Sequence, residues 1–139
     1  MCIRDSWRIQ RLDRRNLKTF MKIGIGIRAM GPQSKPNIIS SVLRSAENVG
    51  LESAWVVDHI AIPPDDAEGS GGRYLDPLTT LSWMAGQTRD IMLGTGVLIL
   101  PYRSRLPLAK AIASLQELSS GRFISVSYTH LTLPTKRIV

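Results

Sequence analysis

The pattern of apolar and polar positions divides the central part of the chain into alternating strands and helices. Short apolar runs bounded by turn residues predict strands, and runs with apolar residues three and four positions apart predict amphipathic helices. The order β-α-β-α-β-α-β implies right-handed crossovers and a parallel sheet, either doubly wound or closed into a barrel. The expected strands are residues 21–28, 53–57, 91–100 and 122–124, and the expected helices are residues 36–49, 77–87 and 107–118.

Residues at the ends of these helices support the assignment. Asp76 is a favourable N-cap, and Pro77 follows it at the first helical position. Pro36 is tolerated in the first turn of its helix, and Gly50 fits the position just after the last turn. The helices at 36–49 and 77–87 are therefore predicted with defined starting points.

The net charge of the chain is carried mainly by its two ends. A formal charge of +7 and a pI near 10.2 would suggest a nucleic-acid or anionic-membrane partner. Between residues 21 and 125, however, ten Lys and Arg face nine Asp and Glu, so the basic excess lies at the two ends. We therefore expect neither nucleic acid nor membrane as a partner, and a cytoplasmic protein. The single Cys2 leaves no internal disulfide.

The two ends mirror each other at the level of DNA. Residues 1–5 can be encoded by a sequence whose reverse complement encodes Val-Ser-Tyr-Thr-His, the residues at 126–130. Such an inverted repeat resembles a transposase-end sequencing adapter read through on both sides of a short insert. We expect residues 1–20 to be adapter and upstream translated sequence without fixed structure, residues 21–125 to be the natural part, and residues 126–139 to be an adapter-derived tail.

Asp58 and His59 are the leading candidates for chemistry. They follow the apolar strand at 53–57, and the carboxyl ends of parallel strands are where α/β folds place their active sites. His59 suits proton transfer near neutral pH, and the neighbouring carboxylate could hold its charge or position a polar edge of a cofactor. The alternative is an Asp that starts a loop and a His that caps it.

Glycines mark two further places. Gly24, Gly26 and Gly31 do not give the spacing of a dinucleotide-binding loop, because the first two fall inside a strand. Gly94 and Gly96 interrupt a buried strand, which indicates close backbone approach. Either a bulged or strained peptide beside a flat ring, or close packing of strand on helix, would explain this second pair. The long loop at 60–74 is either a substrate lid or a solvated insertion.

Five strings together resemble the luciferase-like monooxygenase family, most closely its deazaflavin-dependent oxidoreductase branch. Their order and spacing along the chain also match that family. The strings are residues 21–25, 52–59, 75–81, 93–101 and 118–122.

The resemblance implies an α/β fold, namely the N-terminal part, about four strands, of an incomplete TIM-type (β/α)8 barrel. It also implies hydride transfer between 8-hydroxy-5-deazaflavin and an organic substrate. Asp58 would contact the deazaflavin ring, and His59 would face the substrate as proton donor or acceptor. Gly96 and Val97 would form a non-prolyl cis or bulged peptide that supports the ring. Thr95 and Ile99 would flank it, although some relatives have a hydroxyl-bearing residue where this chain has Ile99.

Two other functions stay open at this point. The first is an FMN-dependent monooxygenase of the same family. The second is a small α/β module that binds an anion through Gly-rich loops without catalysis. For the family reading, we expect the parent protein to be a homodimer acting on a small molecule, and the chain alone to be inactive, since a partial barrel leaves strand edges uncovered.

Overall fold

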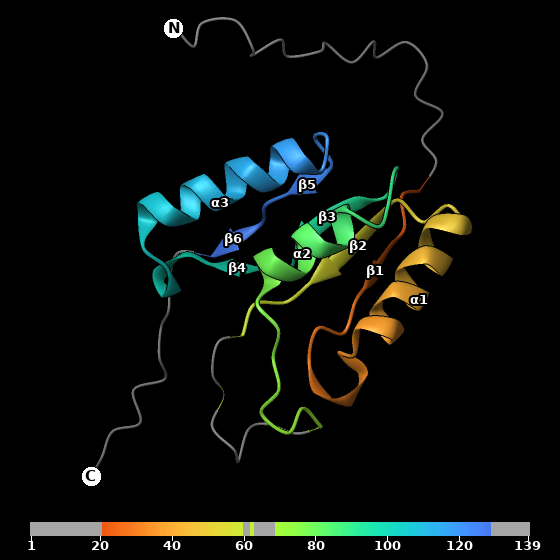
Figure 1. Cartoon of the computed structure of the whole chain (residues 1–139), viewed down its shortest axis with the longest axis horizontal. Coiled ribbons are helices and arrows are strands. Elements are labelled where there is room, and N and C mark those ends of the chain that lie inside the picture. Colours follow the sequence, from red (N-terminus) through yellow and green to blue (C-terminus); the bar gives the residue numbers. More distant parts are fainter. Residues whose placement is uncertain (1–20, 60–61, 63–68, 129–139) are drawn as a thin grey trace, which may run out of the picture.

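The computed structural model describes residues 21–59, 62 and 69–128. Its centre is one sheet in which four parallel strands lie in the order β1-β2-β3-β5 (Figure 1). Because all neighbours are parallel, the carboxyl ends of these strands meet at one edge of the sheet. The bounds are β1 (Gly24–Gly26), β2 (Ser53–Val56), β3 (Met92–Thr95) and β5 (Phe123–Ile124).

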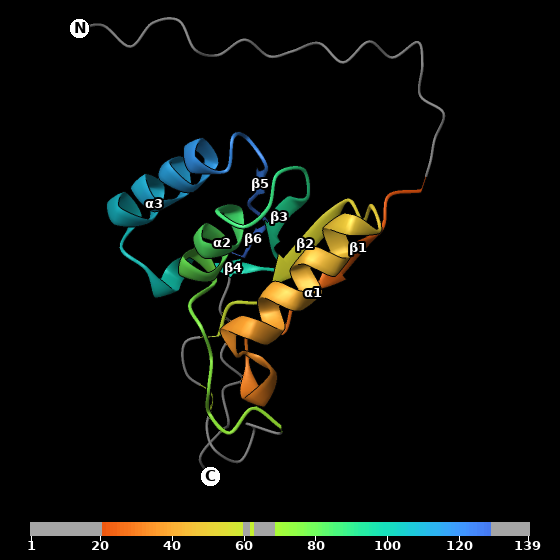
Figure 2. The same ribbon diagram turned by 45° about the vertical axis from the view of Figure 1, so that its right-hand side comes forward.

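Helices connect the strands and build a core on one face of the sheet. Figures 1 and 2 show one helix along the β1 side, one across the middle and one along the β5 side. Ala54 and Val56 of β2 are fully buried in this core, and the residue between them, Trp55, points to the opposite face. The helices are α1 (Pro36–Asn48), α2 (Pro77–Ala85) and α3 (Arg105–Leu118), and the short 3-10 turns are η2 (Gly31–Gln33) and η4 (Leu100–Tyr102).

The three predicted helices are confirmed. Asp76 is the N-cap of α2, where its side chain accepts a hydrogen bond from the backbone N–H of Thr79 (2.8 Å). Leu78, Leu81 and Met84 of the same helix are buried. The parallel sheet and the α/β class are confirmed as well, so the apolar spacing and the capping residues located the helical elements correctly.

The long strand predicted at 91–100 is wrong in its second half. The sheet strand β3 ends at Thr95, the peptide bond Gly96-Val97 is cis, and the chain then forms β4 (Leu98–Ile99) in a separate two-stranded sheet with β6 (Ser127–Tyr128). The apolar pattern reports burial, and Leu98 is indeed fully buried, but burial does not show where the backbone leaves the sheet. The strand predicted at 21–28 is also shorter, since β1 holds only three residues.

Gly94 of β3 and Gly24 of β1 both lie against a side chain that could not be identified from the sequence. A Cβ at Gly94 would lie 2.3 Å from the indole of Trp55, and one at Gly24 would lie 2.8 Å from its Nε1. The indole therefore lies on the face of the sheet opposite the helices, over the backbone of β1 and β3, the two strands next to β2. At Gly94, neither a cofactor ring nor strand–helix packing is the reason for the glycine, because the flat ring belongs to the chain itself.

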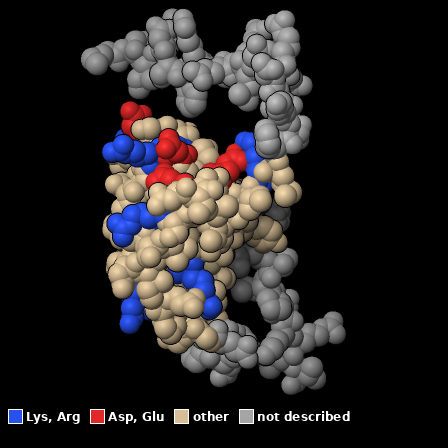
Figure 3. Space-filling view, turned by 90° about the vertical axis from the view of Figure 1, so that its right-hand side faces the viewer, with Lys and Arg blue, Asp and Glu red and all other residues tan. Residues whose placement is uncertain are grey.

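Other expectations concern the ends and the surface. Residues 1–20 and 129–139, and with them Cys2, lie outside the described residues, as does most of the loop at 60–74. Residues 127–128 pair as β6 through their backbone, which depends little on sequence, so the adapter origin of the tail stays a prediction. Figure 3 shows Lys and Arg dispersed over one face rather than gathered in a patch. No helix in the described part is long and apolar enough to span a bilayer.

Candidate active site

The structure brings the predicted site residues together where β2 and β3 end. The backbone N–H of Gly96, next to the cis peptide, donates to the carbonyl oxygen of Val56 (2.7 Å). Further along, the backbone N–H of Ile99 donates to Oδ2 of Asp58 (2.9 Å). The segment carrying the cis peptide is thus fastened at both ends to the end of β2. The expectation of a non-prolyl cis or bulged peptide at Gly96-Val97 is met by the cis bond.

The side chain of Asp58 is fully buried, with 0% exposure. Its two oxygens face the guanidinium of Arg103: Nη1 donates to Oδ2, and Nη2 donates to Oδ1 at 3.0 Å. A buried carboxylate needs such pairing, because an unpartnered charge in the interior is very costly. In the structure the carboxylate is therefore engaged by protein partners, and its contact with a cofactor ring stays a prediction.

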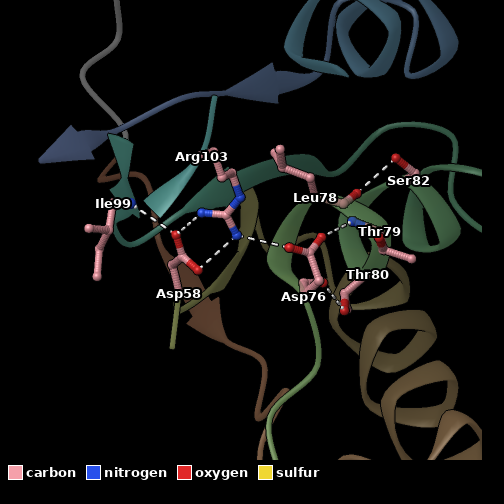
Figure 4. A network of polar contacts seen from close by, with 8 residues as sticks. All are labelled: Asp58, Asp76, Leu78, Thr79, Thr80, Ser82, Ile99 and Arg103. Carbon is pink, nitrogen blue, oxygen red and sulfur yellow. Dashed lines mark hydrogen bonds and ion pairs between the residues drawn. The ribbon is translucent and has the colours of Figure 1, made fainter. Parts of the chain in front are cut away.

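Arg103 joins Asp58 to the start of α2. Its Nη2 also donates to Oδ2 of Asp76 (2.8 Å), so one guanidinium bridges two carboxylates (Figure 4). The hydrogen bonding of its guanidinium to the Asp58 carboxylate is the main factor that raises the pKa of Arg103 above its usual value. Burial alone would raise the pKa of Asp76, but the N–H of Thr79 and the guanidinium together lower it below its ordinary value. Arg103 and Asp76 are thus both charged at neutral pH.

Arg103 was not among the residues predicted for the site, and Asp76 was predicted only as a helix N-cap. A weak indication was present, because Arg103 follows directly on the apolar run that ends a buried strand. A single Arg in a loop, however, is most often a solvated side chain. Its partner lies 45 positions away in the sequence, so only the fold shows that the two meet.

His59 faces a cavity of about 280 Å³ at this edge of the sheet. Its ring lies edge-on to that of Tyr74, with centroids 5.4 Å apart and an interplanar angle of 65°. A second cavity of about 310 Å³ between α1 and α2 is larger and mainly apolar, but no His, Lys or Arg lines it. The imidazole of His59, the guanidinium of Arg103 and the carboxylate of Asp58 all line the smaller of these two cavities. It is lined by Asp58, His59, Tyr74, Asp76, Pro77 and Arg103.

The residues predicted to flank a cofactor lie beside the cis peptide. Thr95 is fully buried, and its Oγ1 donates to the carbonyl of Val126 (2.9 Å) while accepting from the N–H of the same residue (3.0 Å). Ile99 contributes its backbone N–H to Asp58 and keeps its side chain half-buried. Their roles toward a ring stay predictions, since both have protein partners here.

The backbone at Gly96 and Val97 is accessible. A Cβ at Gly96 would meet only the edge of the Trp55 indole, at 3.9 Å, and Val97 is 37% exposed. Within the described residues, no three His, Cys, Asp or Glu side chains are grouped as metal ligands.

Parallel βα units with a histidine and a buried acid at the carboxyl edge of the sheet are typical of the β/α-barrel class of proteins. The profile described as luciferase-like monooxygenase matches residues 17–126. The chain belongs to the luciferase-like monooxygenase family, as its sequence motifs predict.

Individual relatives agree with this assignment. The chain is 34% identical over 104 residues to an F420-dependent glucose-6-phosphate dehydrogenase of Amycolatopsis mediterranei, covering 72% of this chain and 29% of that protein. The coenzyme F420 dependent tetrahydromethanopterin reductase of Methanopyrus kandleri superposes with a TM-score of 0.58 at 29% identity, covering 76% and 26% of the two chains. Monooxygenase RslO1 of Streptomyces bottropensis gives 0.60 at 28%, covering 77% and 32%. The chain thus spans about 29% of the length of its curated relatives.

Proposed function

We propose that the protein carrying this chain is an oxidoreductase that transfers a hydride between an 8-hydroxy-5-deazaflavin coenzyme and a small organic substrate. The observation that carries the proposal is that His59, after β2, and Gly96-Val97, after β3, lie at the same edge of the sheet, where the N–H of Gly96 donates to the carbonyl of Val56. The relatives named for F420, itself an 8-hydroxy-5-deazaflavin, support the choice of coenzyme. The parent protein would be a cytoplasmic homodimer.

The residues divide into a ring-binding and a proton-transferring set. Gly96 and Val97 would support the planar ring with their backbone, and Asp58 would hold the nearby Ile99 through its backbone N–H. Thr95, whose hydroxyl bonds to the backbone of Val126, would flank the ring. When bound, the deazaflavin supplies hydride acceptance or donation. The imidazole of His59 would accept the hydroxyl proton of an alcohol during oxidation, or return it to a carbonyl oxygen during reduction. Tyr74 packs edge-on against the imidazole and would fix its orientation.

The 139 residues alone are proposed to be inactive. Among the described strands, β1 and β5 are the outer members of the sheet, so each leaves one row of backbone hydrogen-bonding groups without a strand partner. On the face of the sheet opposite the helices, Trp55 is also only half-buried. Experiments on the proposed reaction therefore use the intact gene product that contains residues 21–124.

The test is a hydride-transfer assay on that gene product. Oxidised deazaflavin coenzyme is mixed with glucose 6-phosphate or with simple primary and secondary alcohols, and the loss of its visible absorbance is followed. His59→Asn is expected to lower kcat about 100-fold, because a positioned acid–base group contributes at least that much. The matched control Lys110→Met changes an exposed side chain of α3 and should leave kcat unaltered. Equal rates for His59→Asn and the control would refute the role of His59.

A flavin monooxygenase is the second candidate, favoured by the likeness to monooxygenase RslO1. It predicts oxygen consumption with reduced FMN and no reduction of deazaflavin by any alcohol in the panel. The non-catalytic anion-binding module has no observation in its favour, since the chain belongs to an enzyme family and Gly24 of β1 is covered by Ser53 and Trp55.

A further inference from the structure

The carboxylate of Asp58 connects three segments that are separate in the sequence. It extends from the end of β2, accepts the N–H of Ile99 in β4, and pairs with Arg103 just before α3 (Figure 4). Arg103 in turn reaches Asp76 at the start of α2. Asp58 adjoins His59, so every contact that holds this carboxylate also restrains the backbone that carries the imidazole.

Two hydrogen bonds, here called anchors, join the cis-peptide segment, residues 96–99, to the end of β2, and only one of them involves a side chain. A third bond, from the N–H of Leu98 to the carbonyl of Val126, joins the segment to the residues before β6 (2.7 Å). The first anchor is the bond from Gly96 N–H to the Val56 carbonyl, which is backbone to backbone. The second is the bond from Ile99 N–H to Asp58, which exists only while the carboxylate keeps its present position. The second anchor can therefore be changed by substitution while the first is left intact.

The position of the Asp58 carboxylate depends on Arg103. With a side chain that is 0% exposed, the carboxylate has no compensation from water, and its charge is balanced by a guanidinium that is itself only 16% exposed. A bidentate pair fixes the plane of the carboxylate as well as its location. Without the guanidinium, a buried unpaired charge would turn toward water, and the bond to Ile99 would be lost.

We propose that Arg103 is a positioning residue, which holds Asp58 so that the cis-peptide segment and His59 keep a fixed relative placement. The inference rests on the proposed function for its catalytic consequence, but its structural part stands on the contacts of this chain alone. Arg103 lines the same cavity as His59, yet its described contacts are with Asp58 and Asp76, so it acts through them.

The structural part is tested by amide hydrogen exchange of the chain, read by NMR, for Arg103→Met. Loss of the guanidinium should speed exchange at Ile99 by about tenfold or more, because that N–H loses its acceptor. Amides of the sheet that do not bond to Asp58, such as those of Met92, which donates to the carbonyl of Glu52, and Leu93, which donates to the carbonyl of Arg122, should keep their wild-type rates. Arg103→Lys should give an intermediate rate, since an ammonium replaces the charge but not the two-pronged geometry.

The matched control is Arg105→Met, which removes an exposed arginine two positions away. It should leave the exchange of Ile99 unchanged. An unaltered Ile99 rate in Arg103→Met would overturn the proposal. Equal acceleration of all strand amides would also overturn it, since that result would mean that Arg103 only adds global stability.

The catalytic part is measured on the intact gene product loaded with deazaflavin. Arg103→Met should lower kcat about tenfold or more, because small displacements of reacting groups are costly, while KM for the coenzyme changes less than about threefold. Altered Ile99 exchange with unaltered kcat would overturn the positioning role. If the wild-type protein shows no deazaflavin reaction, the proposed function fails by itself, and the exchange experiment still decides what Arg103 holds.

Discussion

Replacing Gly94 by alanine is expected to destabilise the chain by about 2 kcal/mol or more, a typical penalty for forcing extra atoms into a filled space. The new Cβ would lie 2.3 Å from the Trp55 indole, and the atoms it meets belong to the rigid ring rather than to a flexible side-chain end. The indole cannot move aside freely, because its Nε1 donates to Oγ of Ser53 (2.8 Å) and the same edge of the ring lies over Gly24. Urea unfolding of the full chain measures the difference.

A matched control for this effect exists in the neighbouring strand. Gly26 pairs with Trp55 on the other side, but a Cβ there would meet nothing within 4 Å, so Gly26→Ala should change stability by less than about 0.5 kcal/mol. In a Trp55→Ala background, the additional cost of Gly94→Ala should shrink to that of Gly26→Ala. Equal costs for the two glycine variants in the wild-type background would show that the indole does not occupy the space above Gly94.

Arg122→Met is expected to cost about 3 kcal/mol of unfolding free energy, since it leaves several carbonyl groups without a donor at once. The guanidinium donates to four backbone carbonyls and one hydroxyl, which come from the end of α2, the turn after it, the start of β3 and the end of α3. These acceptors, at 2.8–3.2 Å, are the carbonyls of Ala85, Thr88, Ile91 and Ser119 and the Oγ1 of Thr88.

Arg89→Met provides the comparison. Arg89 follows Thr88 in the turn to which Arg122 bonds, but its own side chain is exposed. Its removal should alter stability by less than about 0.5 kcal/mol. Thermal unfolding of both variants gives the measurement. A loss below 1 kcal/mol for Arg122→Met would mean that water replaces the guanidinium at these carbonyls.

Much of the fold could be predicted from the sequence, because its helices carry local information. Asp76 and Pro77 mark the start of α2, and its apolar positions mark the buried face. The strand at 91–100 shows the limit of that approach. Its uninterrupted apolar run records that both halves are buried, while the departure from the sheet at Gly96 depends on tertiary pairing of β4 with β6.

The candidate site was predictable where it follows strand ends and not where it depends on long-range contacts. Asp58 and His59 were located because a parallel sheet gathers its carboxyl ends, and the family motif pointed to Gly96-Val97. The partners of Asp58 could not be found in this way. Charge patterning shows neither that Arg103 folds back onto it nor that a capping residue shares the same guanidinium.

The glycines illustrate a second kind of limit. The sequence correctly indicated that something approaches the backbone closely at Gly94, but it could not say what. Close approach by a cofactor, by a helix or by a neighbouring side chain would each require a glycine at this position. Only the register, which sets Trp55 directly beside Gly94, identifies the indole as the group above it.

The most direct test of the proposed site is an equilibrium titration of the intact gene product that contains residues 21–124, with 8-hydroxy-5-deazaflavin coenzyme and with FMN in parallel, followed by fluorescence. Because relatives of the chain are named for F420, and the backbone at Gly96 and Val97 is accessible beside the end of β2, we expect saturable binding of the deazaflavin, with FMN at least about tenfold weaker, a difference of about 1.4 kcal/mol. Tighter binding of FMN, or saturable binding of neither, would contradict the account.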